Sequence, residues 1–338
     1  MRVLAIESSC DETAAAVVDD GPQLVANVVH AQAAAHAPFG GVVPEVASRE
    51  HAGRITEVVA KALAQGGGMA SIDAVAVTRG PGLVGSLLVG LQFAKGFALA
   101  RRIPWLGINH LEGHVSAALL CGPIAYPHVA LVVSGGHTHL YEVRAFGAYR
   151  LVGGTRDDAA GEAFDKVAKM LGLGYPGGVA IEEQAAGGDA QAIALPRGLP
   201  TLQHFDFSFS GLKTAAREYL ARAGGGLQGQ PLRDFCASLQ EAICDILVKK
   251  AVAAARRFGV RGVLLAGGVA ANTRLREMLQ ERCSEQGLWS FAPPKVLCTD
   301  NAAMIAAAGW LRLRQGQSSQ HGDSALSRWP LEALGNGR

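Results

Sequence analysis

The sequence is poor in charged and aromatic residues, which make up 18% and 6% of its 338 positions. It contains no apolar run of about 18 residues, the length that crosses a membrane as a helix. Its six cysteines form no C-x-x-C pair, which argues against zinc knuckles and redox motifs. The start, MRVLAIESSCDE, reaches acidic residues too soon for a signal peptide. We therefore expect a cytoplasmic protein with reduced thiols and no membrane partner.

The residues that are abundant indicate a large, well-packed protein. Hydrophobic residues make up 49% of the chain, and its length suits two domains better than one. Its 43 glycines follow no collagen-like period, so we expect them at sharp turns or where the backbone approaches a ligand. The net charge of +2 is too small for a protein that binds nucleic acid alone. If RNA is a substrate, partner proteins are expected to help hold it.

The order of predicted elements repeats once along the chain. Each half starts with three short strands and continues with helix, strand, helix, strand and helix. This pattern predicts an α/β fold with two lobes of the actin-like, RNase H-like type, each a mixed sheet flanked by helices, with the active site in the cleft between the lobes. The predicted parts are residues 1–125 completed by a helix at 299–315, residues 126–298 with an insertion at 174–230, and a flexible tail at 316–338.

The stretch INHLEGH places His110 and His114 one helical turn apart, so that both imidazoles can point at one metal ion. A zinc peptidase helix reads H-E-x-x-H and uses the glutamate after its first histidine as the base. Here Glu112 lies about 200° around the helix from both histidines, on the opposite face. Spacing alone equally allows a pair of partly buried polar histidines.

A third ligand is offered by CTDNAAMIA, where Asp300 precedes a predicted helix. Its simpler role is the helix N-cap. The repeat favours a ligand, because GINH and VLCTD end the last predicted strands of the two halves. His110 from the first half and Asp300 from the second are therefore expected to face each other across the cleft between the lobes. Two histidines and one carboxylate suit Fe(II) or a catalytic zinc. His137 and His139, on one face of a strand, are rival ligands.

Two glycine-containing turns indicate an anion or nucleotide site. VVSGGHTH runs from a strand into Ser134, Gly135 and Gly136, a turn whose N–H groups can hold an anion, although a plain hairpin has the same pattern. LLAGGVAANTRLREML places Asn272 near a helix start, where N–H groups favour negative charge and ordinary capping is the alternative. The chain has no G-x-x-x-x-G-K-[ST] motif, which excludes a P-loop enzyme.

Acidic residues accompany these turns. Asp165 and Glu182 can accept hydrogen bonds from ribose hydroxyls, with Gly178 letting a sugar or base approach closely, although each acid alone is more often part of a solvated helix face. At the N-terminus, Glu7 replaces the usual aspartate of the first phosphate loop in actin-like ATPases, and bulky polar residues follow it instead of glycine. This difference argues against ordinary ATP hydrolysis.

With these motifs in order, the chain resembles the catalytic subunits of the tRNA threonylcarbamoyladenosine synthase, a family once labelled glycoproteases. The resemblance covers residues 3–314 and rests on the stretches GVVPEVASREH, TRGPGLVGSLLVG, NHLEGH, LVVSGGHT, FDKVAKMLGLGYPGG, FSFSGLKTA, LAGGVAANTRLR and CTDNAAMIAAAG, in family order. His139 departs from the pattern, because many members have glutamine there.

The resemblance implies transfer of the threonylcarbamoyl group from threonylcarbamoyl-AMP to the exocyclic amine of the adenosine that follows the anticodon, in tRNAs reading codons that begin with A. It implies that His110, His114 and Asp300 bind one Fe(2+) per subunit, with zinc as an ion that isolated protein can carry. The residues implied to hold the adenylate are Val132, Val133, Ser134, Gly135, Gly136, Asp165, Gly178, Glu182 and Asn272. The implied partners are tRNA, a degenerate paralogous subunit and a small ATPase, with no DNA.

No residue stands out as the general base. Asp11 and Glu12 follow the first strand and are the candidates, while turn formation is their simpler role. Charges on long helices are usually solvated, but some are candidate RNA contacts. These are Arg101, Arg102, Lys213, Lys249, Lys250, Arg256 and Arg257. A metal-dependent glycoprotein peptidase and a non-catalytic nucleotide-binding scaffold remain as rival functions.

Overall fold

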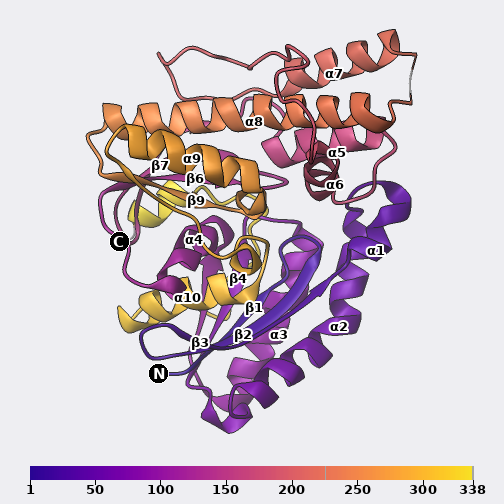
Figure 1. The fold of residues 1–338 in the computed structure, drawn as a ribbon. Helices are drawn as coiled ribbons and strands as arrows, with labels where there is room; N and C mark the ends of the chain where they lie inside the picture. Colours follow the sequence, from indigo (N-terminus) through magenta and orange to yellow (C-terminus); the bar gives the residue numbers. More distant parts are fainter. Residues whose placement is uncertain (225, 337–338) are drawn as a thin grey trace. The chain divides into compact units, whose positions relative to one another are not determined.

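The computed structural model describes residues 1–224 and 226–336. The chain forms two compact units, of which unit 1 comprises residues 1–124 together with the chain from Asp300 onward, and unit 2 comprises residues 125–299. Each unit contains one five-stranded mixed sheet with helices packed on it (Figure 1). The predicted α/β class with two lobes of the same kind is confirmed.

The strands of unit 1 are β1 Val3–Glu7, β2 Glu12–Asp19, β3 Gln23–Ala31, β4 Ala74–Gly80 and β5 Trp105–Asn109. They lie in the order β3-β2-β1-β4-β5. β1 pairs antiparallel with β2 and parallel with β4, so it is the central strand, and all of its residues are buried. A strand covered on both faces needs apolar residues on both, which explains the unbroken run Val-Leu-Ala-Ile.

The helices of unit 1 are α1 Ala33–His36, α2 Pro44–Gln65, α3 Val84–Arg101, α4 His110–Ser116 and α10 Ala302–Arg314. Successive strand residues face opposite sides of a sheet. Leu4 and Ile6 share one core with apolar residues of α2 and α3. On the other face, a Cβ added to Gly309 of α10 would lie 2.4 Å from the Cβ of Ala76 in β4. α10 therefore covers the face opposite to α2 and α3 and brings the end of the chain into unit 1.

Unit 2 repeats this plan. Its strands are β6 His128–Val133, β7 Thr138–Ala145, β8 Ala148–Gly154, β9 Gly262–Ala266 and β10 Trp289–Phe291, in the order β10-β9-β6-β7-β8. β6 pairs antiparallel with β7 and parallel with β9, as β1 does with β2 and β4. The repeat predicted from the order of elements is therefore a repeat of sheet topology.

The helices of unit 2 are α5 Ala160–Met170, α6 Gly177–Ala185, α7 Ser210–Arg222, α8 Gly229–Arg257 and α9 Thr273–Glu285. The segment expected as an insertion supplies α6 and α7. α8 has 29 residues, and its buried face forms much of the core of this unit. Within the described parts of the chain, no helix combines the length and apolar character that a membrane span needs.

The last predicted strand, WSFAPPKVLC, is much shorter than expected. β10 ends at Phe291, and the chain continues through Pro293 and Pro294 into a 3-10 turn at Lys295–Leu297. Proline has no N–H to donate to a neighbouring strand, which explains why pairing stops there. Asp300 therefore does not end a strand. It lies immediately before the N-cap of α10, which determines its position.

The composition of residues 316–338 predicts a flexible tail, but the described part of this segment makes specific contacts with unit 1. The backbone N–H of Ser319 donates to the carbonyl of Trp105 at 2.9 Å, and that of Leu326 donates to the carbonyl of Arg79 at 2.8 Å. Leu331 is fully buried. The backbone of this segment bonds to β4 and β5, a pairing that composition does not reveal.

Candidate functional site

The two histidines of INHLEGH are positioned by the junction of β5 with α4. Asn109 is the N-cap of α4, and its Oδ1 accepts hydrogen bonds from the N–H groups of Leu111 at 2.9 Å and Glu112 at 3.3 Å. His110 is the first residue of the helix and His114 lies one turn later. Their ring centroids are 4.6 Å apart, which confirms that both imidazoles share one face.

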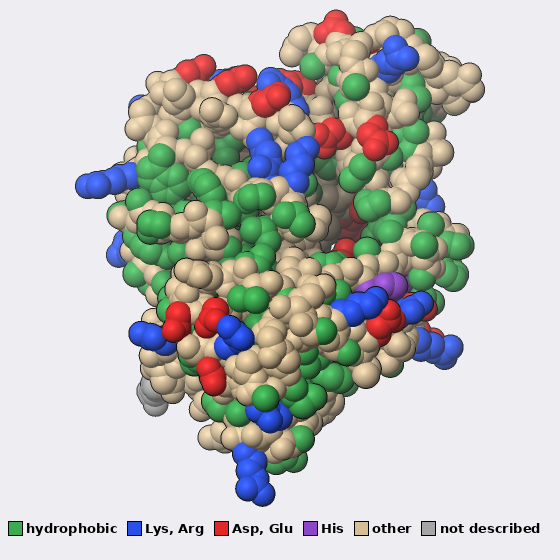
Figure 2. Space-filling model, turned by 60° about the horizontal axis from the view of Figure 1, so that its bottom comes forward, with side chains coloured by type: hydrophobic (Ala, Val, Ile, Leu, Met, Phe, Trp, Pro, Cys, Tyr) green, Lys and Arg blue, Asp and Glu red, His purple; other side chains and the backbone are tan. Residues whose placement is uncertain are grey.

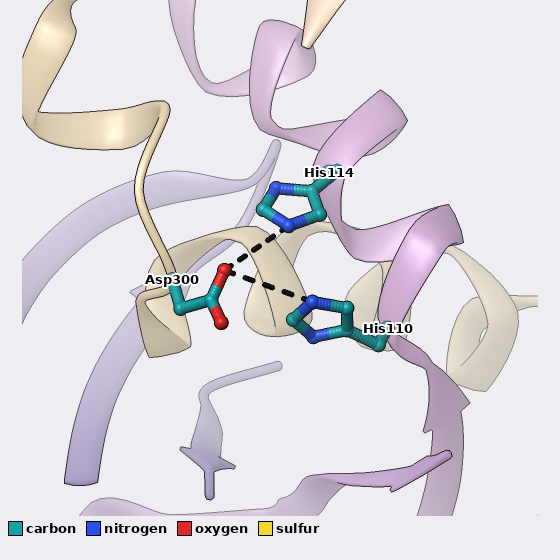
Figure 3. A group of neighbouring side chains, drawn as sticks. All are labelled: His110, His114 and Asp300. Carbon is teal, nitrogen blue, oxygen red and sulfur yellow. Dashed lines mark ion pairs between the residues drawn. The ribbon is translucent and has the colours of Figure 1, made fainter. Parts of the chain in front are cut away.

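Asp300 reaches the same place from the start of α10. The N-cap of α10 is Asn301, whose Oδ1 accepts from the N–H of Met304 at 3.1 Å, so the simpler role considered for Asp300 belongs to its neighbour. Asp300 Oδ1 lies 3.1 Å from His114 Nε2 and 3.6 Å from His110 Nε2 (Figure 3).

Close packing of α4 and α10 holds this arrangement. A Cβ added to Gly113 of α4 would lie 2.7 Å from the Cδ1 of Ile305 in α10, so only glycine fits between the helices at this point. All three candidate ligands belong to unit 1. The expectation that Asp300 faces His110 from the other lobe is therefore wrong, because Asp300 lies directly before the N-cap of α10, in the same unit as the histidines.

The three side chains fit a divalent cation. Their ligand atoms all lie within 4.8 Å of one another, and no other such group of three occurs among the described residues. Ligands about 2.1 Å from one ion lie roughly 3 to 3.5 Å apart, close to the separations from Asp300. Nδ1 of the buried His114 has no hydrogen-bond partner among the described residues, and its Nε2 faces the carboxylate of Asp300, as expected of a side chain that shares an ion with that carboxylate. Two histidines with one carboxylate are typical of Fe(II) or catalytic zinc.

Glu7, the last residue of β1, and Ser9, in the turn that follows, support His110. His110 Nδ1 lies 3.1 Å from Glu7 Oε2 and 3.1 Å from Ser9 Oγ. Glu7 also accepts a hydrogen bond from Thr78 Oγ1 at 2.6 Å and one from the N–H of Ser9 at 2.5 Å. Because a carboxylate only accepts, the ring hydrogen of His110 belongs on Nδ1, which leaves Nε2 as a metal ligand. Sequence reasoning missed this role of Glu7.

The charges around His110 favour a positive group. Burial by itself lowers the pKa of His110, but the carboxylates of Asp300 and Glu7 outweigh it and raise that pKa to about 9. Burial likewise raises the pKa of Glu7, yet the charge and hydrogen bond of His110 bring it below its ordinary value. In the absence of a metal, a proton on His110 balances the two carboxylates, and a bound cation would do the same.

Asp11 and Glu12, the candidate bases, lie at the start of β2 in the same unit. Burial, followed by the charges of Asp300 and Asp11, raises the pKa of Glu12 well above its ordinary value. The backbone carbonyl of Asp11 accepts from the N–H of Gln32 at 3.0 Å, which continues the pairing of β2 with β3 by one residue. Their role as bases stays a prediction.

Glu112 points away from the metal ligands. Both of its oxygens accept hydrogen bonds from the guanidinium of Arg312 in α10, at 2.5 and 2.7 Å, and Glu112 is fully buried. The prediction that Glu112 cannot serve as a peptidase base is confirmed, because its carboxylate forms a buried ion pair on the opposite side of α4. The rival histidines belong to unit 2, where His139 Nδ1 lies 3.0 Å from the hydroxyl of Tyr141.

The Ser-Gly-Gly sequence forms a tight turn between β6 and β7 of unit 2. The N–H of Ser134 donates to the carbonyl of His137 at 2.8 Å, and the N–H of His137 donates to Ser134 Oγ at 3.2 Å. Gly135 and Gly136 are exposed at the tip, while Val132 and Val133 are buried in β6.

The start of α5 lies directly against this turn. The N–H of Gly161 donates to the carbonyl of Ser134 at 3.2 Å, and a Cβ on Gly161 would lie 2.6 Å from that oxygen and 2.9 Å from the backbone of Gly135. Because the N–H of Ala160 donates to Thr138 Oγ1 at 2.9 Å, the start of α5 uses its first donors internally. The exposed backbone of Gly135 and Gly136 is the part of this region that suits an anion.

The other predicted adenylate residues lie on α5, α6 and the start of α9. Asp165 Oδ1 accepts from the N–H of Gly177 at 2.7 Å, and a Cβ on Gly177 would lie 2.5 Å from the Cα of Asp165. A Cβ on Gly178 would meet only Phe164, at an ordinary 3.9 Å. Gly177, not Gly178, is therefore the glycine that internal packing requires, and the surface at Gly178 is open for a ligand.

Glu182 and Asn272 form one network. Asn272 caps α9 through Oδ1, which accepts from Leu275 N at 2.9 Å, and its Nδ2 donates to Glu182 Oε2 at 3.3 Å. The same Nδ2 donates to Gln240 Oε1 at 2.7 Å, a contact that sequence reasoning missed because α8 lies in a different part of the chain. Ordinary capping is thus one role of Asn272, and it coexists with the orientation of Glu182.

Two of the candidate RNA contacts are occupied inside unit 2. Lys250 is fully buried, and its ammonium donates to the backbone carbonyl of Asp206. Lys213 donates to Asp158 at 2.7 Å. The expectation that Lys250 contacts RNA is wrong, because its side chain lies in the core beneath α8. On the face shown in Figure 2, lysine and arginine occur in small groups among acidic residues and form no broad basic surface.

A protein-family model described as tRNA N6-adenosine threonylcarbamoyltransferase matches residues 23–307. A tRNA N6-adenosine threonylcarbamoyltransferase of Syntrophus aciditrophicus is 51% identical over 340 residues, which cover all of both chains. One of Anaeromyxobacter dehalogenans (strain 2CP-C) is 55% identical over 333 residues, covering 98% of this chain and 99% of the relative. These matches confirm the family resemblance seen in the motifs.

Two solved structures are similar in fold. Component A of the (R)-2-hydroxyglutaryl-CoA dehydratase of Acidaminococcus fermentans matches with a TM-score of 0.56 and 16% identity, over 93% of this chain and 99% of that one. HypF of T. kodakarensis matches with a TM-score of 0.62 and 14% identity, over 93% of this chain and 48% of that one. At these identities the likeness shows the two-lobed fold alone.

Proposed function

The chain belongs to the tRNA N6-adenosine threonylcarbamoyltransferase family, and from this premise we propose how its residues carry out the transfer. The donor is threonylcarbamoyl-AMP, and the acceptor is the exocyclic amine of the adenosine that follows the anticodon, in tRNAs reading codons that begin with A. A bond forms between the amine nitrogen and the carbamoyl carbon, the bond from that carbon to the AMP oxygen breaks, and the amine loses a proton. The observation that carries this proposal is the convergence of His110, His114 and Asp300 in a member of this family.

His110 and His114 would hold the metal through Nε2, and Asp300 would hold it through Oδ1. We propose one Fe(2+) per subunit, with zinc as the ion that isolated protein can carry. When bound, such a cation supplies Lewis-acid stabilisation of the negative charge that develops on a carbonyl or phosphate oxygen. The chain's own contribution is orientation: Glu7 fixes the tautomer of His110, and Gly113 lets α10 bring Asp300 close.

Unit 2 binds the adenylate part of the donor in this proposal. Gly135 and Gly136, exposed at the tip of the turn, offer their backbone N–H groups to the phosphate, which stabilises the AMP that leaves. Asp165 and Glu182 accept hydrogen bonds from the ribose, and Gly178 lets the nucleoside approach closely. The residues proposed to line this site are Val132, Val133, Ser134, Gly135, Gly136, Asp165, Gly178, Glu182 and Asn272.

Glu12 and Asp11 are the proposed acceptors of the amine proton. A raised pKa makes a carboxylate a stronger base once it is ionised, and burial next to Asp300 and Asp11 raises that of Glu12. An adenine amine is a weak nucleophile, so the positioning of amine and carbamoyl carbon is expected to supply much of the rate.

The proposed partners are tRNA, a degenerate paralogous subunit and a small ATPase, with a cytoplasmic location and no DNA or membrane partner. The charge of the chain supports the proposal of partner proteins. A net charge of +2 and the mixed charges in Figure 2 give this chain little attraction of its own for a polyanion. Partner proteins are therefore proposed to supply part of the tRNA-binding surface.

The test uses anaerobically purified protein with its partners, labelled threonylcarbamoyl-AMP and a tRNA transcript. Modified nucleoside and released AMP are measured for the unaltered chain, for His110→Ala with His114→Ala, and for His30→Ala as the control. Loss of Lewis-acid stabilisation worth several kcal/mol predicts a fall of roughly a thousandfold in the double variant only. Retention of tRNA modification by that variant would overturn the proposal and favour a non-catalytic nucleotide-binding scaffold.

A further inference from the structure

The segment from Gln317 to Leu331, here called the C-terminal strap, lies along the part of unit 1 that bears the metal ligands. Its first contacts are with β5, the edge strand that leads into α4. The N–H of Ser319 donates to Trp105 O at 2.9 Å, and Ser319 Oγ accepts from the N–H of Gly107 at 3.1 Å. The strap therefore follows β5 toward Asn109.

At Asn109 the strap makes direct contact with the residue that starts the metal-binding helix. Asn109 is fully buried, and its Nδ2 donates to the backbone carbonyl of Trp329 at 2.9 Å. Its Oδ1 caps α4 at the same time. Because Oδ1 faces N–H donors and Nδ2 faces a carbonyl, only one orientation of the amide satisfies both ends. Trp329 thus fixes the side chain that sets the first turn of α4, where His110 lies.

The strap also bonds to the end of β4 and to the loop that follows it, which contacts Ser9 beside His110. Leu326 N donates to Arg79 O at 2.8 Å, and Ser327 O accepts from the N–H of Gly82 at 3.4 Å. The residue after Gly82, Leu83, donates its N–H to Ser9 O at 2.9 Å, and Ser9 is the residue whose hydroxyl lies beside His110 Nδ1.

A third contact links the beginning of the strap to α10. Gln317 Oε1 accepts from Arg312 Nη1 at 2.9 Å, while the same guanidinium binds Glu112 of α4. An open pocket of about 200 Å³ lies between the strap and α4, and its lining includes Asn109, Glu112 and Trp329. At this pocket the side chains of Asn109 and Glu112 are held by polar contacts with Trp329 and Arg312, so loss of such a contact leaves a buried polar group without its bond.

We propose that the C-terminal strap is a positioning element of the metal centre, acting through the hydrogen bond between Asn109 and Trp329. This inference rests on the proposed function, since it gives the strap the role of orienting the ligands of the proposed metal. Removal of the contact frees α4 to shift and turns His110 and His114 away from a shared point with Asp300. Groups that orient metal ligands typically change metal affinity about 10- to 100-fold when altered.

The test compares two shortened chains and one point variant. A chain ending at Arg328 lacks the Trp329 carbonyl, whereas a chain ending at Leu331 keeps it and serves as the matched control. Asn109→Asp keeps the oxygen that caps α4 but loses the donor to Trp329. The added negative charge favours cation binding, so weaker binding in this variant reports geometry and not charge.

The measurements are the Kd for Co²⁺ by competition with a chelator, the visible absorption of the bound Co²⁺, and the thermal unfolding of the metal-free proteins. The chain ending at Arg328 and Asn109→Asp are expected to bind about 10- to 100-fold more weakly, with a changed spectrum. The chain ending at Leu331 is expected to stay within about twofold of the intact chain. If the chain ending at Arg328 does not fold, Asn109→Asp decides alone.

Normal Co²⁺ affinity and spectrum in Asn109→Asp would overturn the role of the strap. If His114→Ala abolishes binding in the same series, the metal centre stands and only the strap proposal fails. If the intact chain binds no Co²⁺, the proposed function and the strap proposal both fail. In the transfer assay, Asn109→Asp is expected to lower kcat while leaving the KM for tRNA within about twofold, because Asn109 is fully buried and the substitution alters no surface side chain.

Discussion

The turns that follow the first strand of each sheet occupy the same topological position and have opposite chemistry. At the end of β1, Glu7, the last strand residue, and Ser9, in the turn, are buried side chains that bond to a histidine of the metal centre. After β6, Gly135 and Gly136 expose backbone at the tip of a tight turn. One sheet plan thus presents side-chain carboxylates suited to a cation in unit 1 and bare N–H groups suited to an anion in unit 2. Topology places the turn, and the residues in it decide what it binds.

The two units also contrast in how they hold a buried cation. Arg312 in unit 1 forms a two-point ion pair with Glu112, whereas Lys250 in unit 2 bonds to a main-chain carbonyl and lies 5.5 Å from the ring centroid of Phe207. The first arrangement links two ligand-bearing helices. The second ties the segment before α7 to α8.

The largest expected effect comes from breaking the ion pair of unit 1. Arg312→Met leaves Glu112 buried without its partner, which typically costs about 3 to 5 kcal/mol. The free energy of unfolding of unit 1, measured by hydrogen exchange in α4 and α10, is expected to fall by this amount. Glu112→Leu combined with Arg312→Met is expected to recover most of it and to keep transfer activity. Loss of activity in a well-folded double variant would contradict this prediction and indicate a catalytic role for Glu112.

The corresponding prediction for unit 2 concerns pH. Burial lowers the pKa of Lys250 from 10.5 to about 8. Between these values the unfolded chain binds more protons than the folded one, so the free energy of unfolding of unit 2 rises with pH, by at most about 1.4 kcal/mol per pH unit. Lys250→Met is expected to remove this rise, measured by hydrogen exchange in α8 from pH 8 to 10.5. An equal rise in the variant would show that another group is responsible.

Glu7→Gln tests the turn of unit 1. The substitution removes the carboxylate charge beside His110 Nδ1 and is expected to weaken Co²⁺ binding about 10- to 100-fold, while AMP binding by unit 2 is unchanged. Glu142→Gln, which alters a carboxylate of β7 that is paired with Arg150 of β8, is the matched control. Parallel titrations with Co²⁺ and AMP measure both effects. Unchanged Co²⁺ affinity in Glu7→Gln would contradict the orienting role of Glu7.

Gly161→Ala tests the turn of unit 2. The added methyl overlaps the carbonyl of Ser134 and the backbone of Gly135, so the turn must move. Overpacking of this kind costs about 1 to 3 kcal/mol, and AMP affinity is expected to fall roughly tenfold with Co²⁺ affinity unchanged. Gly211→Ala has no atom within 4 Å of the new methyl and is the control. A fall in Co²⁺ affinity with unchanged AMP affinity would show that this turn does not bind the adenylate.

Local patterns in the sequence predicted much of this molecule. The spacing of His110 and His114 is a property of one helical turn, and the position of Glu112 on the other face follows from the same periodicity. The repeat of strands and helices predicted two sheets of the same topology. Asp300 is a ligand candidate for a different reason from the predicted one: the predicted strand before it stops at Phe291, and the start of α10 brings it to the histidines within one unit.

Contacts that depend on strand register or on main-chain atoms could not be predicted. Glu7 reaches His110 because β1, β4 and β5 are neighbours, and the two residues are 103 positions apart. The hydrogen bond from Asn109 ends on the backbone of Trp329, which no side-chain pattern marks. The composition of residues 316–338 predicts a flexible tail, because the hydrogen bonds that hold this segment are made by main-chain carbonyls and N–H groups, which every residue has.

The central claim is that His110, His114 and Asp300 bind one cation. Crystals grown anaerobically from iron-loaded protein, measured on both sides of the iron absorption edge, test it most directly. We predict one anomalous peak about 2.0 to 2.2 Å from His110 Nε2, His114 Nε2 and an oxygen of Asp300. Iron bound elsewhere, with these three side chains coordinating no ion, would contradict the account.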